Sequence, residues 1–270
     1  MRQVAIGWQI YAVDNEDISV PGQPGRFSDE EDNLYPLGNG VQYRPRWFAV
    51  IGAAAGFDAY REPSPDREDE HSIRVDGSEV FLCPEVPRWT STRNYAYGYN
   101  YQFLGNTRFK EIDGGGEDGR DSFINFPVRA SSIAASATVL AADSLGTAAG
   151  KPELLREPNM EDGGRDDEDG TPLHARGGHG YALDPPRLAE SGSDYADPRN
   201  RADLHRSAPA PRHNERTNVS FADGHVTTTT LQDLGYAVNG DGSVAARGPE
   251  TTNKRFSGTM VDDLAPGLDE

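Results

Sequence analysis

Three residues near the carboxyl end of the chain, His213, Asp223 and His225, are of types that bind metals or transfer protons. Nine residues separate His213 from the Asp223-Gly224 pair, and His225 follows directly. A hairpin turn is a sufficient reason for Asp223 and Gly224, because both tolerate a positive φ angle. In such a turn, His213 has the reach to fold back and hydrogen-bond the Asp223 carboxylate.

A metal site in this stretch would need three or four converging ligands, for instance His213, Asp223, His225 and Asp143. With an open position for water, the same four residues would suit a metal-dependent hydrolase. The sequence contains no H-E-x-x-H, paired C-x-x-C, G-x-S-x-G or P-loop signature. A structural turn is therefore the favoured interpretation, metal binding the second and catalysis the third. We expect the protein not to be an enzyme.

Two acidic clusters offer candidate sites of another kind. The first comprises Asp113, Glu117, Asp118 and Asp121 around three consecutive glycines, and the second comprises Asp162, Asp166, Asp167 and Asp169. Flexible Gly-Asp loops can wrap Ca²⁺, which prefers carboxylate and carbonyl oxygens. The second cluster is not an EF-hand, because Arg165 stands at its first ligand position. Calcium sites and solvated runs of charge both remain open interpretations of the two clusters.

Composition narrows the class of protein. The 270 residues include 44 acidic and 26 basic side chains, which gives a formal net charge of −18. So acidic a surface repels phosphate backbones and anionic lipid, which argues against nucleic acid as a partner and suits contact with divalent cations. Cys83 is the only cysteine, so no disulfide can close within the chain. Its favoured role is that of a small buried apolar side chain. No run of about 18 or more apolar residues occurs, and no signal peptide is visible.

The elements that position these residues follow from hydrophobic periodicity. Val4, Trp8 and Tyr11 share one face of a helix at the start of the chain, which acidic residues and a Pro-Gly pair terminate. Residues 23–43 predict a polar loop, and residues 47–60 predict a buried helix weakened by two glycines.

Several later segments predict strands by alternation or apolar content: 78–83, 94–104, 138–142 and the hairpin pair 218–221 and 226–230 across an Asp-Gly turn. Residues 231–236 predict a short helix. Residues 144–211 show almost no apolar periodicity and are too long for a plain loop, so we expect an insertion that packs as an irregular layer.

The sum of these elements is an α+β fold. Together with the resemblance described below, they imply an N-terminal helix packed on an antiparallel sheet with long irregular loop insertions. Its expected core residues are Phe81, Tyr97, Tyr99, Val139 and Phe221. The expected organisation is as follows: 1–20, the end of a helix and its exit turn; 21–143, the α+β domain; 144–211, the insertion; 212–248, the hairpin region; 249–270, a polar tail.

Residues 212–226, RHNERTNVSFADGHV, resemble the H-x9-DG segment at the C-terminal end of large bacterial pseudopilin-like proteins, which are common in planctomycetes and related to type IV prepilins and type II secretion pseudopilins. Four other stretches are similar to that family's motifs and stand in its order: MRQVAIGWQIYAVDNED, EVFLCPEVP, NYAYGYNYQFLG and LAADS. The resemblance extends to about residue 263 and is weakest over 144–211. It implies structural roles for His213, Asp223, Gly224, Cys83 and Pro84.

Proteins of this family normally begin with a cleavable leader and a long hydrophobic helix, and Met1 falls well inside that helix. Membrane attachment would therefore depend on an upstream helix that this sequence lacks. The family often carries a cysteine just upstream that could pair with the cysteine of the Cys-Pro motif, and Cys83 has no such partner here.

The resemblance implies a non-enzymatic, extracytoplasmic structural subunit of a cell-surface secretion or pilus-like assembly, or of an extracellular filament. Its partners would be like subunits or other pilin-like proteins, with Ca²⁺ bridging the acidic clusters. The alternative is an extracellular binding module whose 144–211 insertion recognises a surface partner or polysaccharide. Exposed aromatic residues there would favour this alternative, and only Tyr181 and Tyr195 occur.

Overall fold

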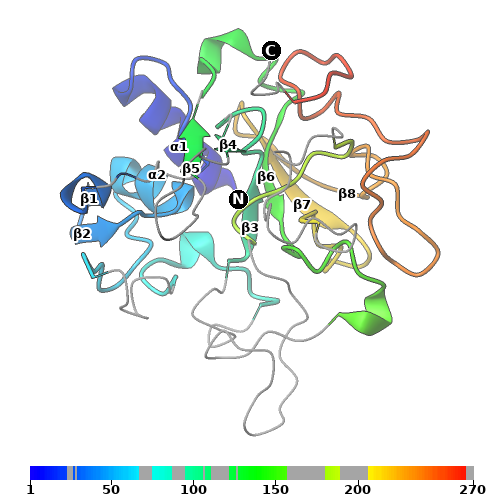
Figure 1. Cartoon of the computed structure of the whole chain (residues 1–270), viewed down its shortest axis with the longest axis horizontal. Coiled ribbons are helices and arrows are strands. Elements are labelled where there is room, and N and C mark those ends of the chain that lie inside the picture. The colour runs from blue at the N-terminus through cyan, green and yellow to red at the C-terminus, as the bar shows by residue number, and fades with distance from the viewer. Residues whose placement is uncertain are drawn as a thin grey trace, which may run out of the picture.

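A computed structural model of the chain describes residues 1–22, 27, 29–66, 75–86, 95–105, 107–110, 122–125, 127–156, 180–188 and 206–265. These residues form two helices and antiparallel sheets, which confirms the α+β class (Figure 1). The central sheet has the strand order β3-β6-β7-β8, and two separate hairpins, β1-β2 and β4-β5, accompany it.

The helices are α1 (Arg2–Asp14) and α2 (Trp47–Ala55). The strands are β1 (Leu34–Leu37), β2 (Gly40–Tyr43), β3 (Tyr97–Tyr99), β4 (Thr107–Lys110), β5 (Ser122–Asn125), β6 (Val139–Asp143), β7 (Thr217–Phe221) and β8 (Val226–Thr229). Short 3₁₀ turns are η1 (Glu31–Asn33), η3 (Glu79–Phe81), η4 (Ala130–Ser132) and η5 (Glu153–Leu155). No helix in the described part of the chain is long and apolar enough to cross a membrane.

Helix α1 is fixed by the apolar face that its periodicity predicted. Val4 and Trp8 are buried, and Tyr11 is half-buried against the same core cluster. The Trp8 indole donates to the Tyr99 hydroxyl at 3.2 Å, which joins α1 to strand β3. The helix also packs on α2, and Gly7 permits this approach because a Cβ there would lie 3.2 Å from the Ile51 carbonyl oxygen.

The central sheet is antiparallel throughout, and the register of its strands sets the positions of the polar residues at the ends of the strands. Tyr97 of β3 lies opposite Asp143 of β6, and Ala142 of β6 lies opposite Val219 of β7. The predicted strand 138–142 and the predicted hairpin around the Asp-Gly turn are both confirmed, the latter as β7 and β8.

Apolar side chains of the described residues form two large buried clusters, and a small third one contains Cys83, Val86 and Ala96. The expected core residues Phe81 and Tyr99 belong to the first cluster, Val139 and Phe221 to the second, and Tyr97 is half-buried. The described parts of 144–211 contribute to the second cluster through Leu145, Ala149, Leu183, Ala208 and Ala210. This segment therefore supplies core as well as loop.

Two predicted strands are wrong in whole or in part, because local hydrogen bonds turn the backbone there. Residues 78–83 are not a strand, because the Ser78 hydroxyl accepts the Val80 N–H at 3.3 Å and starts the 3₁₀ turn η3. The predicted strand 94–104 is limited to β3, because the chain turns after Tyr99 with the Leu104 N–H bonded to the Asn100 carbonyl.

Three more corrections concern two turns and the end of a helix. The polar loop predicted over 23–43 contains the β1-β2 hairpin. Its two-residue turn is Gly38-Asn39, a typical hairpin sequence that the prediction missed because the surrounding residues are mostly polar. Residues 231–236 form a series of turns rather than a helix, and Gly235 there has φ of 96°. Helix α2 ends sooner than predicted, at Gly56 in the left-handed conformation.

Candidate functional site

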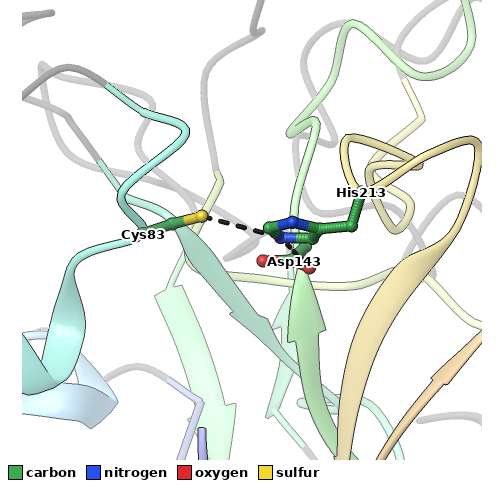
Figure 2. Close-up of side chains that lie close together, drawn as sticks. All are labelled: Cys83, Asp143 and His213. Carbon is green, nitrogen blue, oxygen red and sulfur yellow. Dashed lines mark hydrogen bonds and ion pairs between the residues drawn. The ribbon is translucent and has the colours of Figure 1, made fainter.

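Cys83, Asp143 and His213 meet at one end of the central sheet, and Figure 2 shows their side chains converging. The His213 Nε2 atom lies 3.1 Å from the Asp143 Oδ2 atom and 3.7 Å from the Cys83 Sγ atom. One donor atom from each residue lies within 4.8 Å of the others. Three segments far apart in the sequence therefore bring sulfur, nitrogen and oxygen donors to one point.

Asp143 is placed by its position as the last residue of β6. Its side chain is 1% exposed, and its Oδ2 atom accepts the Asn218 N–H of β7 at 2.8 Å. The register places Tyr97 of β3 opposite it on the other side. The two neighbouring strands thus fix the Asp143 backbone, and the Asn218 N–H of β7 orients its carboxylate.

Cys83 is held by the same strand that borders Asp143. The Tyr97 hydroxyl donates to the Leu82 carbonyl at 2.8 Å, which ties the segment after η3 to β3. The Val86 N–H then bonds to the Cys83 carbonyl at 2.9 Å, closing a turn with Pro84 at its second position. The proline shapes this turn, and the buried Cys83 thiol points toward His213 (Figure 2).

His213 is held by a tight turn that leads into β7. His213 and Arg216 exchange backbone hydrogen bonds of 2.9 and 3.2 Å. The residues between them, Asn214 and Glu215, have φ angles of 53° and 62°, the conformation of a type I′ hairpin turn. Its side chain is 25% exposed, so the imidazole is the part of the cluster nearest solvent.

Burial dominates the electrostatics of the cluster. It raises the pKa of Asp143, against the opposing effects of the Arg212 guanidinium, the Asn218 N–H and His213. Burial also raises the pKa of the Cys83 thiol, although the Glu85 backbone N–H and Arg212 favour the thiolate. Without a cation, the thiol is therefore protonated at neutral pH, and a protonated thiol is a poor nucleophile.

The arrangement is also unlike a nucleophile–base–acid triad. In such a triad, the acid bonds one imidazole nitrogen and the nucleophile the other. Here the thiol and the carboxylate both approach Nε2 of His213. A single ring nitrogen cannot accept a proton from Cys83 while donating one to Asp143, so the geometry does not serve nucleophilic catalysis.

Asp223 and His225 form a separate pair at the opposite end of β7. The Asp223 Oδ1 atom accepts the His225 N–H at 3.0 Å and lies 2.6 Å from His225 Nδ1. His213 bonds Asp143 instead, so the expected reach of His213 to Asp223 is wrong. The five residues of β7 intervene, and the strand rises about 3.3 Å per residue. The four-residue metal or hydrolase site of His213, Asp223, His225 and Asp143 is therefore not formed.

The Asp223-Gly224 turn is structural, as favoured. Gly224 has φ of 94°, and its N–H bonds to the Phe221 carbonyl at 2.9 Å. The Gln9 side chain of α1 donates to the Ala222 carbonyl at 2.8 Å. The turn therefore gives the first helix a docking point on the sheet.

No protein-family model, no curated protein and no solved structure matches this chain. The family resemblance thus stays a prediction.

The other sequence candidates divide into two groups. Both acidic clusters, Asp113 to Asp121 and Asp162 to Asp169, lie outside the described residues, as does Tyr195. Tyr181 is buried, and its carbonyl accepts the Trp47 indole N–H at 2.7 Å. It therefore offers no exposed aromatic surface for the binding-module alternative.

Sequence reasoning named Cys83, Asp143 and His213 but did not join Cys83 to the other two. The available signal was weak: a buried strand ending in Asp143 and a histidine at the entry to the next strand. The position of Cys83 depends on the Tyr97–Leu82 hydrogen bond, which no local pattern encodes.

Proposed function

We propose that this protein is a non-enzymatic, extracytoplasmic structural subunit of pseudopilin-like type, which acts by assembling with like subunits or other pilin-like proteins. The setting would be a cell-surface secretion or pilus-like assembly, or an extracellular filament. The observation that carries the proposal is the two-faced character of helix α1.

The inner face of α1 packs on α2 and the central sheet through Val4 and Trp8. Its outer face carries apolar side chains at helical spacing, Ile6, Ile10 and Val13. Ile6 is 39% exposed and Val13 is 81% exposed. Apolar residues in a row on one exposed helix face suit contact with a second apolar surface.

We take a like subunit as the occupant of this outer face, since pilin-type subunits pack through their first helix. The stripe is short, so its burial contributes only part of a stable interface. Loop contacts would have to supply the rest.

The geometry of the Cys83 cluster is compatible with this role, because the thiol shares one imidazole nitrogen with a carboxylate and so lacks the arrangement of a nucleophilic triad. A pocket among the described residues is lined mainly by apolar and aromatic side chains, such as Trp47, Phe48 and Phe81.

Calcium is part of the proposal because of charge. A net charge of −18 opposes the stacking of like subunits. Divalent cations bound by the two acidic clusters would reduce that repulsion, either within one subunit or between neighbours. Assembly should therefore be stronger in Ca²⁺ than in a monovalent salt of equal ionic strength.

Sedimentation velocity over a range of protein concentrations tests this function. We expect concentration-dependent association that Ca²⁺ strengthens and that the double variant Ile6→Glu/Val13→Glu abolishes. The matched control is Leu154→Glu/Leu155→Glu, because Leu154 is 98% exposed on η5, away from α1. A monomer at all concentrations with Ca²⁺, or equal loss of association in both double variants, would contradict the proposed role of α1.

A further inference from the structure

We propose that Cys83, Asp143 and His213 form a binding site for a thiophilic divalent cation, with Zn²⁺ as the best-matched ion. This inference is independent of the proposed assembly, because the site is formed within one chain and needs no second subunit.

The distances between the donor atoms match the edges of a tetrahedral site. Zinc lies about 2.3 Å from a cysteine sulfur and about 2.0–2.2 Å from imidazole nitrogen or carboxylate oxygen. At tetrahedral angles, these bonds place sulfur about 3.6 Å from nitrogen and nitrogen about 3.4 Å from oxygen. The corresponding distances are 3.7 Å between Cys83 Sγ and His213 Nε2, and 3.1 Å between His213 Nε2 and Asp143 Oδ2. The third pair, Cys83 Sγ and an Asp143 carboxylate oxygen, lies within 4.8 Å. Two of the three distances are therefore close to the edges of a tetrahedral site.

Hydrogen bonding alone leaves this cluster incompletely satisfied. Asp143 and Cys83 compete for the same His213 nitrogen, so one proton cannot serve both contacts. The Oδ1 atom of Asp143 is buried and has no hydrogen-bond partner among the described residues. Buried carboxylate oxygens normally have a partner. A cation bound through Oδ1 as well as Oδ2 would supply this partner.

The donor set selects the kind of ion. Thiolate and imidazole favour zinc and similar transition metals, whereas Ca²⁺ and Mg²⁺ take oxygen ligands only. A metal-bound thiol is deprotonated by the metal itself, so Cys83 and Asp143 together balance the charge of a divalent ion. Arg212 lies beside the cluster and adds a positive charge, which weakens cation binding. We therefore expect an affinity below that of structural zinc sites with four protein ligands.

The bound ion would tie three segments of the chain at one point. Cys83 follows η3, Asp143 ends β6 and His213 precedes β7 (Figure 2). The turn that carries Cys83 is tied to the sheet here by the hydrogen bond from the Tyr97 hydroxyl to the Leu82 carbonyl. A bond from the metal to Cys83 would fix this turn, and with it η3, at this end of the sheet.

Cobalt spectroscopy on the wild-type chain is the first test. Co²⁺ should occupy the site and give a thiolate-to-cobalt charge-transfer band that saturates at one equivalent, and Zn²⁺ should abolish this band by displacement. Because Cys83 is the only cysteine, such a band can come from no other residue of the chain. Absence of the band at millimolar Co²⁺ would overturn the proposal.

Thermal unfolding gives the second test, since a ligand that binds only the folded state raises the midpoint. We expect Zn²⁺ to raise the midpoint of the chelator-treated protein by a few degrees, and Cys83→Ala and His213→Ala to lose this rise. His225→Ala is the matched control, because its imidazole is exposed and lies outside the cluster. A rise that persists in both cluster variants but disappears in His225→Ala would assign the ion to the Asp223 pair and refute the site. Should a cluster variant not fold, the cobalt band of the wild type decides.

Discussion

The Tyr99 hydroxyl joins the first helix to the sheet, so its removal should lower the free energy of unfolding. It accepts the Trp8 indole N–H at 3.2 Å and donates to the Val20 carbonyl at 3.1 Å. Tyr99→Phe removes the oxygen alone. The ring, which stacks on Trp47 with centroids 5.1 Å apart, is unchanged.

The expected loss of stability follows from the two groups that lose their partner, the Trp8 indole N–H and the Val20 carbonyl. Trp8 and Tyr99 are both buried, so the indole N–H loses its acceptor where water cannot easily replace it. Leaving a buried polar group without a partner costs about 1–3 kcal/mol. With the Val20 carbonyl also losing a donor, we expect a decrease of about 2–4 kcal/mol in the free energy of unfolding.

Urea unfolding followed by tryptophan fluorescence measures this decrease. Tyr236→Phe is the matched control, because Tyr236 is equally buried but its hydroxyl makes one hydrogen bond among the described residues, to the Asp184 carbonyl at 2.7 Å. It should cost about 1–2 kcal/mol. The reasoning is refuted if Tyr99→Phe costs no more than Tyr236→Phe, because the link between α1 and the sheet would then contribute nothing of its own.

Two other predictions concern a close contact and a surface charge. In Gly52→Ala, the new Cβ would lie 2.3 Å from the Phe57 carbonyl oxygen, and overpacking of this kind costs about 1–3 kcal/mol. Gly240→Ala, with nothing within 4 Å, should leave the urea midpoint almost unchanged, and equal costs would contradict the steric argument. Slight burial acts to raise the pKa of Asp223, but the backbone N–H and imidazole of His225 outweigh it and lower the pKa. The charge therefore stabilises the fold above the unfolded pKa of about 3.9 and loses this effect as pH falls through the lower folded pKa. Asp223→Asn keeps an acceptor for the His225 N–H, so its destabilising effect should be smallest at the acid end of the titration and grow to less than about 1 kcal/mol at pH 5 for this exposed pair. A cost independent of pH in urea titrations would show that the charge is not involved.

Local patterns predicted the elements whose signals lie within a few residues. The spacing of Val4 and Trp8 predicted the buried face of α1, and Asp223-Gly224 predicted the β7-β8 hairpin. The prediction failed at residues 78–83, because a single hydrogen bond from Val80 to the Ser78 hydroxyl outweighs the strand preference of the apolar residues that follow.

The sequence by itself determined which donor residues exist: one cysteine, a carboxylate at the end of a buried strand and a histidine before the next strand. Only the tertiary structure decided that Cys83, Asp143 and His213 meet while Asp223 stays apart. The reason is register. Asp143 lies opposite Tyr97, Tyr97 holds the turn of Cys83, and the strand β7 carries His213 and Asp223 to opposite ends of the sheet. Pairing between strands that are distant in the sequence sets these positions, and the periodicity of a single segment carries no information about that pairing.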